Sequence, residues 1–290
     1  MKRSRKLSLG ALLTVCALFG VVSSASAHSG EFARFNYCPS TTAGVAKCLV
    51  SETAGGKVVL GKKTVPIVNT VTLQGGVSTP VAHFSTFFGA TNGNTLSKTP
   101  QPVPGGLTGL VNCKEISLSW LRVSCEAVFE NGLTGVNATV ELARPASEIK
   151  VSEVNLITEE GVAVVLPVKV HLENPLLGSS CYIGSSSSPI NWNLTTGETT
   201  PPAGTAPIKG EYETFELREH SEIAVVGGVR MVDNAWGAPE ASGCGGWPAE
   251  YILDPIINAS VGVPSAAGKN VAALEQGTIY LATVASVNGH

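Results

Sequence analysis

The chain has 290 residues, of which 43% are hydrophobic and only 14% are charged, and its formal net charge is −3. Without residues 1–27, the remaining 15 bases face 22 acids, which gives a net charge of −7. This acidic balance argues against nucleic-acid binding, which depends on basic patches, and against electrostatic docking on anionic lipid.

Residues 1–27 have the pattern of a secretory signal peptide. The basic start consists of Lys2, Arg3, Arg5 and Lys6. An apolar run follows from Leu7 to Val22, and the segment ends with Ala25-Ser26-Ala27, the small-x-small pattern that a signal peptidase cuts after. The run has 16 positions, whereas a spanning helix needs about 20. We therefore expect cleavage after Ala27, secretion or loose attachment to the cell envelope, and no transmembrane segment in the rest of the chain.

Cleavage at this point would make His28 the first residue. Its α-amine and one ring nitrogen can then hold the same metal ion, and a second histidine would complete a histidine brace, which suits copper. This feature resembles the N-terminus of secreted copper-dependent polysaccharide monooxygenases, a resemblance that covers one residue. The candidates for the second ligand are His83, His171 and His220. The alternative is that His28 is a solvated terminal residue without a ligand.

Six cysteines follow the predicted cleavage site, and an even number in an exported chain predicts disulfides. Six cysteines allow about 15 connectivities. We expect neighbours in sequence to pair, because two of the spacings suit local links: Cys38–Cys48, Cys113–Cys125 and Cys181–Cys244. No C-x-x-C pair or Cys/His cluster has the spacing of a zinc site.

Alternating apolar and polar residues predict antiparallel strands. The expected strands are residues 57–60, 65–73, 136–142, 168–172, 190–194, 223–231 and 278–284. A one-residue slip within residues 116–129 predicts a bulge. The clearest helical pattern covers residues 248–258, where Pro255 predicts a short or broken helix. The expected fold class is all-β, an antiparallel sandwich with little helix that disulfides stabilise.

Residues 28–290 are long enough for two domains or for one large β domain. Residues 60–67 and 183–190 share the spacing G-x-x-x-x-P-I. This repeat predicts two related halves, a first β domain of residues 28–147 and a second of residues 148–290. The alternative is that two Gly/Pro-rich turns are alike by chance.

Three segments carry a resemblance to a known group of proteins. They are LPVKVHLENP at residues 166–175, GSSCYIGS at residues 178–185 and LDPIIN at residues 253–258. They resemble segments of uncharacterised secreted proteins of high-GC Gram-positive bacteria, and the resemblance covers most of the chain after the signal peptide. It implies a bacterial, exported protein. It assigns no activity, so no residue acquires a role from it.

Motifs of common hydrolases, such as G-x-S-x-G and H-E-x-x-H, are missing from the sequence. A glycosidase with paired carboxylates remains open, because its two carboxylates meet only in the fold. Trp192 alternates with Ile190 and Leu194, so we expect it in the core rather than on a sugar-binding surface.

Taken together, these patterns predict a secreted, non-enzymatic binding or structural protein that needs no cofactor. Its expected partner is a component of the cell envelope or a glycan. Two alternatives remain: a copper-dependent, monooxygenase-like enzyme that uses His28, and a carrier that holds an apolar ligand between its sheets. The ligand, the oligomeric state and the retention on the cell surface stay open.

Overall fold

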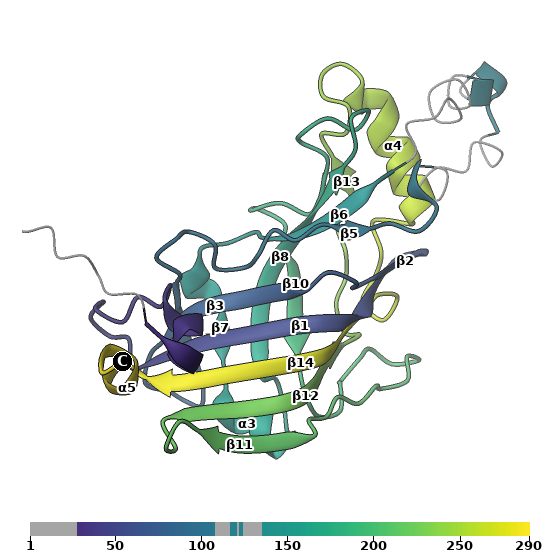
Figure 1. Cartoon of the computed structure of the whole chain (residues 1–290). Coiled ribbons are helices and arrows are strands. Elements are labelled where there is room, and N and C mark those ends of the chain that lie inside the picture. Colours follow the sequence, from purple (N-terminus) through teal and green to yellow (C-terminus); the bar gives the residue numbers. More distant parts are fainter. Residues whose placement is uncertain (1–27, 108–116, 121, 124–134) are drawn as a thin grey trace, which may run out of the picture.

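The computed structural model describes residues 28–107, 117–120, 122, 123 and 135–290. Its strands form two layers that cross one another (Figure 1). The predicted signal peptide, the predicted Cys113–Cys125 pair and most of the predicted bulge lie outside these residues. The mostly antiparallel β architecture confirms the predicted fold class.

The first sheet has the strand order β11-β12-β14-β1-β3-β4. Its strands are β11 (Thr214–Arg218), β12 (Ile223–Asp233), β14 (Val271–Thr283), β1 (Lys47–Leu60), β3 (Val71–Val77) and β4 (Ser85–Gly89). A short strand, β2 (Lys63–Pro66), forms a hairpin with the end of β1. The long β1 and β14 pair along nearly their whole lengths and form the middle of this layer.

The second sheet is built around β8 (Val164–Glu173). On one edge, β8 pairs with β6 (Asn137–Leu142) and β7 (Lys150–Val151). On the other edge it pairs with β10 (Ile190–Leu194) and β9 (Tyr182–Ile183). The outer strands are β5 (Gln101–Pro102), beside β6, and β13 (Ala241–Ser242), beside β9.

Pairing between β4 and β7 connects the two sheets, so the polypeptide folds one continuous sheet into a sandwich. Figure 1 shows β8 and β10 running across the strands of the first sheet. Both sheets contain strands from residues 28–147 and from residues 148–290, since β1 pairs with β14 and β6 pairs with β8. Whether the two halves arose by duplication stays a prediction.

A small second core covers the outer face of the first sheet at one end. There the 3-10 helix η1 (Gly30–Phe35) and the C-terminal helix α5 (Val284–Asn288) pack on the sheet. Phe32 and Phe35 of η1 contact Val50 of β1 within this cluster. Cys38 is bonded to Cys48 beside it, which is the first of the predicted disulfides. Apolar residues therefore lie on both faces of the first half of β1.

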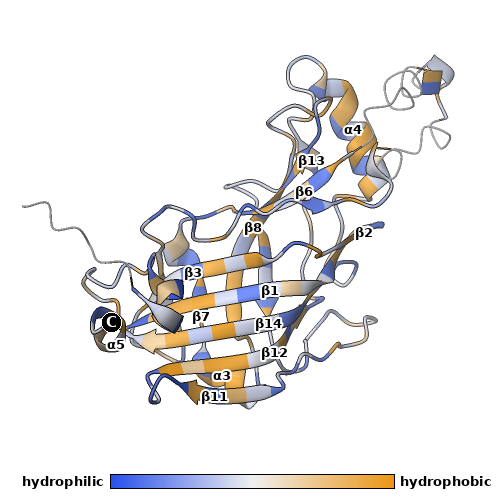
Figure 2. Ribbon diagram, in the orientation of Figure 1, coloured by the Kyte–Doolittle hydropathy of each residue, from blue (hydrophilic) through white to orange (hydrophobic). Residues whose placement is uncertain are grey.

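Helix α4 (Glu250–Val261) lies at the far end of the second sheet and passes through Pro255 without a break. The predicted break at Pro255 is wrong, because packing outweighs the lost hydrogen bond. Leu253, Ile257 and Val261 all point into the main core, and Figure 2 shows apolar residues along much of the helix. Beside α4, Cys181 is bonded to Cys244, another of the predicted disulfides.

The predicted strand 65–73 is also wrong in part, since residues 67–70 separate β2 from β3. The chain turns there because the backbone N–H groups of Val68 and Asn69 donate to the Gln101 side chain rather than to a strand. The remaining expected strands are observed, with β10 at the predicted bounds. Two further short helices, η3 (Ala146–Glu148) and α3 (Glu153–Thr158), flank β7.

Asp233 connects the two sheets at the end of β12. Its carboxylate accepts hydrogen bonds from the backbone N–H of Asn193 in β10 (2.6 Å) and from that of Ala235 (2.8 Å). Asp233 is only 1% exposed, and loss of hydration raises the pKa of its carboxyl group, although the two hydrogen bonds oppose this rise. The folded state therefore holds the Asp233 proton more tightly than the unfolded state does.

This raised pKa gives a testable pH dependence. Stability from Asp233 is fully present below its unfolded pKa of about 3.9 and is lost as the pH rises through the higher folded pKa. Asp233→Asn removes this loss. It also costs about 1–3 kcal/mol at every pH, because the amide offers only one acceptor oxygen to two N–H donors. Urea unfolding from pH 3.5 upward measures both effects, and parallel stability curves for wild type and D233N would contradict this account.

Candidate ligand-binding cavity

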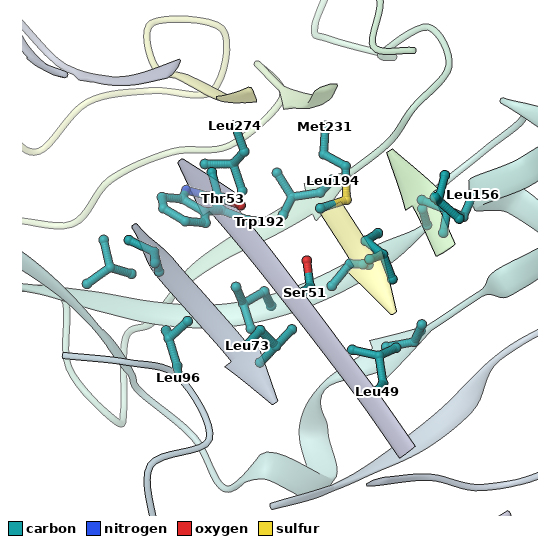
Figure 3. A pocket seen from close by; sticks show the side chains of 18 of the residues that line it. Leu49, Ser51, Thr53, Leu73, Leu96, Leu156, Trp192, Leu194, Met231 and Leu274 are labelled. Carbon is teal, nitrogen blue, oxygen red and sulfur yellow. The ribbon is translucent and has the colours of Figure 1, made fainter. Parts of the chain in front are cut away.

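A cavity of about 590 Å³ lies between the two sheets (Figure 3). Sites for small molecules commonly have volumes of roughly 300–1,000 Å³, so the cavity is large enough for one. Strands β1, β3, β12 and β14 line one side of it, whereas β6, β8 and β10 line the other. Helix α3 closes part of one end.

The cavity exists because several inward positions carry short side chains. Along β1, Leu49, Ser51 and Thr53 face the cavity, and the residues between them face outward. Ser51 lies in the middle of the strand, where a packed core would hold a large apolar side chain. Ala138 on β6 and Ala224 on β12 also line the space. The leucine and valine side chains around these positions do not fill it.

Most of the lining is apolar. The large apolar side chains include Leu49, Leu60, Leu73, Leu96, Val140, Leu156, Leu166, Val170, Trp192, Leu194, Val226, Met231, Leu274, Ile279 and Leu281. Figure 3 labels several of them, among them Leu49, Leu73 and Leu194, around one space between the sheets. A surface of this kind attracts apolar molecules, because removing apolar surface from water lowers the free energy.

Polar groups lie at the two ends of the cavity and at a few points inside it. At one end, the Gln101 amide is satisfied by the backbone of the turn between β2 and β3. At the α3 end, Lys47 and Glu153 form an ion pair. Inside, Ser51 and Thr53 contribute hydroxyl groups and Trp192 contributes an indole N–H. No histidine lines the cavity among the described residues.

The exposure of the lining residues indicates that the cavity opens between α3 and β11. Among the lining residues, only Val154 and Thr158 of α3 and Phe215 of β11 are exposed to solvent. Val154 is 53% exposed and Phe215 is 52% exposed. An apolar rim of this kind lets an apolar molecule pass from solvent to the interior.

The four predicted copper ligands lie on separate elements. His28 precedes η1, where its backbone N–H donates to Asn36 Oδ1 at 2.7 Å. His83 lies in the turn between β3 and β4, and His220 lies in the turn between β11 and β12. His171 lies on β8 and stacks on Tyr182. No hydrogen bond or ring contact joins any two of the four, and the described residues contain no group of three or more His, Cys, Asp or Glu side chains placed for a metal ion.

His171 belongs to a polar cluster on the outer face of the second sheet. Its Nδ1 lies 3.4 Å from Glu173 and 3.7 Å from Glu141, and Lys169 contacts Glu141 at 3.6 Å. Lys169 also lies 3.8 Å from the centre of the Tyr182 ring. Burial, together with the negative charges of Glu141 and Glu173, raises the pKa of Tyr182. Lys169 pairs with Glu141, and His171 lies against Tyr182 and the two carboxylates, so the cluster is explained as a stabilised surface of β6 and β8.

Trp192 lies in the core, as its alternation with Ile190 and Leu194 predicts, whereas the sequence did not predict the cavity-lining part of β1. The available signal was Leu49, Ser51 and Thr53 at alternate positions. That alternation was hidden, because Cys48 and Val50 on the other face are also buried, under η1 and α5.

No protein-family model matches the chain, and neither a curated protein nor a solved structure is significantly similar to it. In the part of the chain that the structure describes, no helix is both long enough and apolar enough to cross a membrane.

Proposed function

We propose that the protein is a non-enzymatic binding protein that holds one elongated, apolar small molecule between its two sheets. The cavity carries this proposal, because its size and its apolar lining are those of a small-molecule site. The two disulfides and the signal-peptide pattern of residues 1–27 support an extracellular or cell-envelope location for this function.

The energetic cost of leaving the cavity empty supports a bound ligand. Voids left in protein cores cost about 24 cal/mol per Å³, so a sealed void of 590 Å³ would cost on the order of 10 kcal/mol. That is comparable to the whole stability of a typical domain. The opening beside Phe215 lowers this cost, but an apolar ligand removes it by restoring van der Waals contacts.

Fluorescence titration tests the proposal directly. The protein is first extracted with organic solvent and refolded, and it is then titrated with N-phenyl-1-naphthylamine, an uncharged apolar dye. We expect saturable binding of one dye per chain with a blue-shifted emission, and displacement of the dye by undecan-2-one. A fluorescence increase that stays linear with dye concentration, without displacement, would overturn the proposal.

The opening between α3 and β11 makes a kinetic prediction. Val154→Trp places a large side chain on the rim, so we expect the rate constants for dye association and dissociation to fall together, each about threefold or more, whereas the dissociation constant changes little. Stopped-flow fluorescence measures both rates. Val81→Trp is the control, because Val81 is 78% exposed in the turn between β3 and β4 and does not line the cavity. Unchanged rates in V154W would place the opening elsewhere.

A further inference from the structure

The indole nitrogen of Trp192 is a buried hydrogen-bond donor that has no partner among the described residues. Trp192 is 3% exposed and lies on β10, where Ile190 and Leu194 share its inward face. Its ring packs against Trp236 with 6.0 Å between the ring centres. The Nε1 atom of Trp192 is shielded from solvent and forms no hydrogen bond with the described residues.

The neighbouring Trp236 shows the usual arrangement. It is equally buried, but its Nε1 donates a hydrogen bond to the backbone carbonyl of Asp233 at 3.2 Å. Buried tryptophans generally satisfy their N–H in this way, since an unpaired buried donor is costly. Trp192 differs from Trp236 in one further respect: its side chain lines the cavity. Because the Trp192 ring borders the cavity, a molecule inside the cavity is the candidate for the missing acceptor.

The charges around the cavity define the chemistry of that occupant. Lys47 and Glu153 are the only charged residues among its described lining, and they pair with each other at the α3 end. A charged group placed deep in the cavity would have no counter-charge and would lose its hydration. The interior offers one N–H donor and the hydroxyls of Ser51 and Thr53, which Figure 3 shows in the same space as Trp192.

We propose that the ligand is an uncharged molecule with a long apolar body and an acceptor oxygen, as in a ketone or an ester. That oxygen accepts a hydrogen bond from Trp192 Nε1. This inference rests on the proposed function and deepens it, because it names the chemical class of the ligand. The indole N–H can only donate, so it favours an acceptor oxygen over a hydrocarbon of the same shape.

A matched pair of ligands separates this hydrogen bond from general apolar binding. Undecan-2-one carries a carbonyl oxygen where 2-methylundec-1-ene carries a methylene group, and the two molecules otherwise have the same shape. Both are measured by displacement of N-phenyl-1-naphthylamine from wild type and from Trp192→Phe. For each ligand, the dissociation constant of W192F is divided by that of wild type. The hydration of the free ligand is the same in both measurements and therefore cancels. We expect W192F to weaken the ketone about tenfold relative to the alkene, the usual effect of one lost hydrogen bond.

Trp236→Phe is the control, because it removes a neighbouring buried indole that does not line the cavity and whose N–H already donates to the Asp233 carbonyl. We expect W236F to change the affinities for ketone and alkene by the same factor. If W192F changed the affinities for ketone and alkene by the same factor, the inference would be overturned while the proposed function stayed intact. If neither ligand displaces the dye from wild type, the proposed function itself fails. Undecanoate, which is charged at pH 8, should bind more weakly than the ketone. Tighter binding of undecanoate would overturn the inference that the ligand is uncharged.

Discussion

Replacing Ser51 by phenylalanine is expected to stabilise the ligand-free protein and to weaken ligand binding. The Ser51 side chain projects into the cavity from the middle of β1 (Figure 3). A benzyl group at this position fills empty space and buries apolar area, which contributes about 1–2 kcal/mol to the free energy of unfolding. For a protein of this size, the gain corresponds to a rise in Tm of roughly 2–6 °C. The filled space excludes the ligand, so affinity falls more than about tenfold.

Val50→Phe is the matched control, because Val50 is the next residue on β1 and faces the opposite side. It is 4% exposed and is packed between the sheet and η1. A larger side chain in this filled core costs about 1–3 kcal/mol, so V50F should unfold at a lower temperature yet still bind the dye. Differential scanning fluorimetry with and without undecan-2-one measures both properties. Destabilisation by S51F with unchanged binding would show that the cavity is not the site.

Removal of the Cys181–Cys244 disulfide is the second large expected effect. The bond joins residues 63 positions apart in the sequence, whereas Cys38 and Cys48 are separated by 10. Restricting the longer loop in the unfolded chain contributes about 4 kcal/mol, compared with about 3 kcal/mol for the shorter loop. The double variant Cys181→Ala/Cys244→Ala should therefore lose more stability than Cys38→Ala/Cys48→Ala.

The position of this disulfide adds to the effect. Cys181 and Cys244 are fully buried in the main core, and Asp254 of α4 accepts hydrogen bonds from the backbone N–H groups of Gly243 and Cys244. The bond thus fixes the loop on which α4 packs. Guanidinium unfolding of both double variants gives the comparison. A larger loss for the Cys38–Cys48 variant would mean that the N-terminal cluster, rather than the α4 region, limits stability.

The sequence predicted most strands whose two faces have different environments. β10 has buried residues at Ile190, Trp192 and Leu194 and exposed asparagines between them, so its alternation gives its bounds. The first half of β1 escaped prediction because apolar side chains point to both faces there. Cys48 and Val50 lie under η1, a contact between separate segments that the local sequence pattern does not show.

The candidate site was less predictable than the fold. A carrier of an apolar ligand between the sheets was one alternative from the sequence, but no lining residue could be named. A cavity depends on what lies opposite each short side chain, and Ser51 faces strands that are more than 80 residues away in the sequence. The unpartnered donor of Trp192 is likewise invisible in the sequence.

The location of a bound ligand tests the central claim most directly. A crystal of the protein grown with 11-bromoundecan-2-one would reveal the bromine through its anomalous scattering. The account predicts one bromine peak between the two sheets and the carbonyl oxygen within hydrogen-bonding distance of Trp192 Nε1. Bromine peaks only on the outer surface, with water filling the space around Ser51, would contradict it.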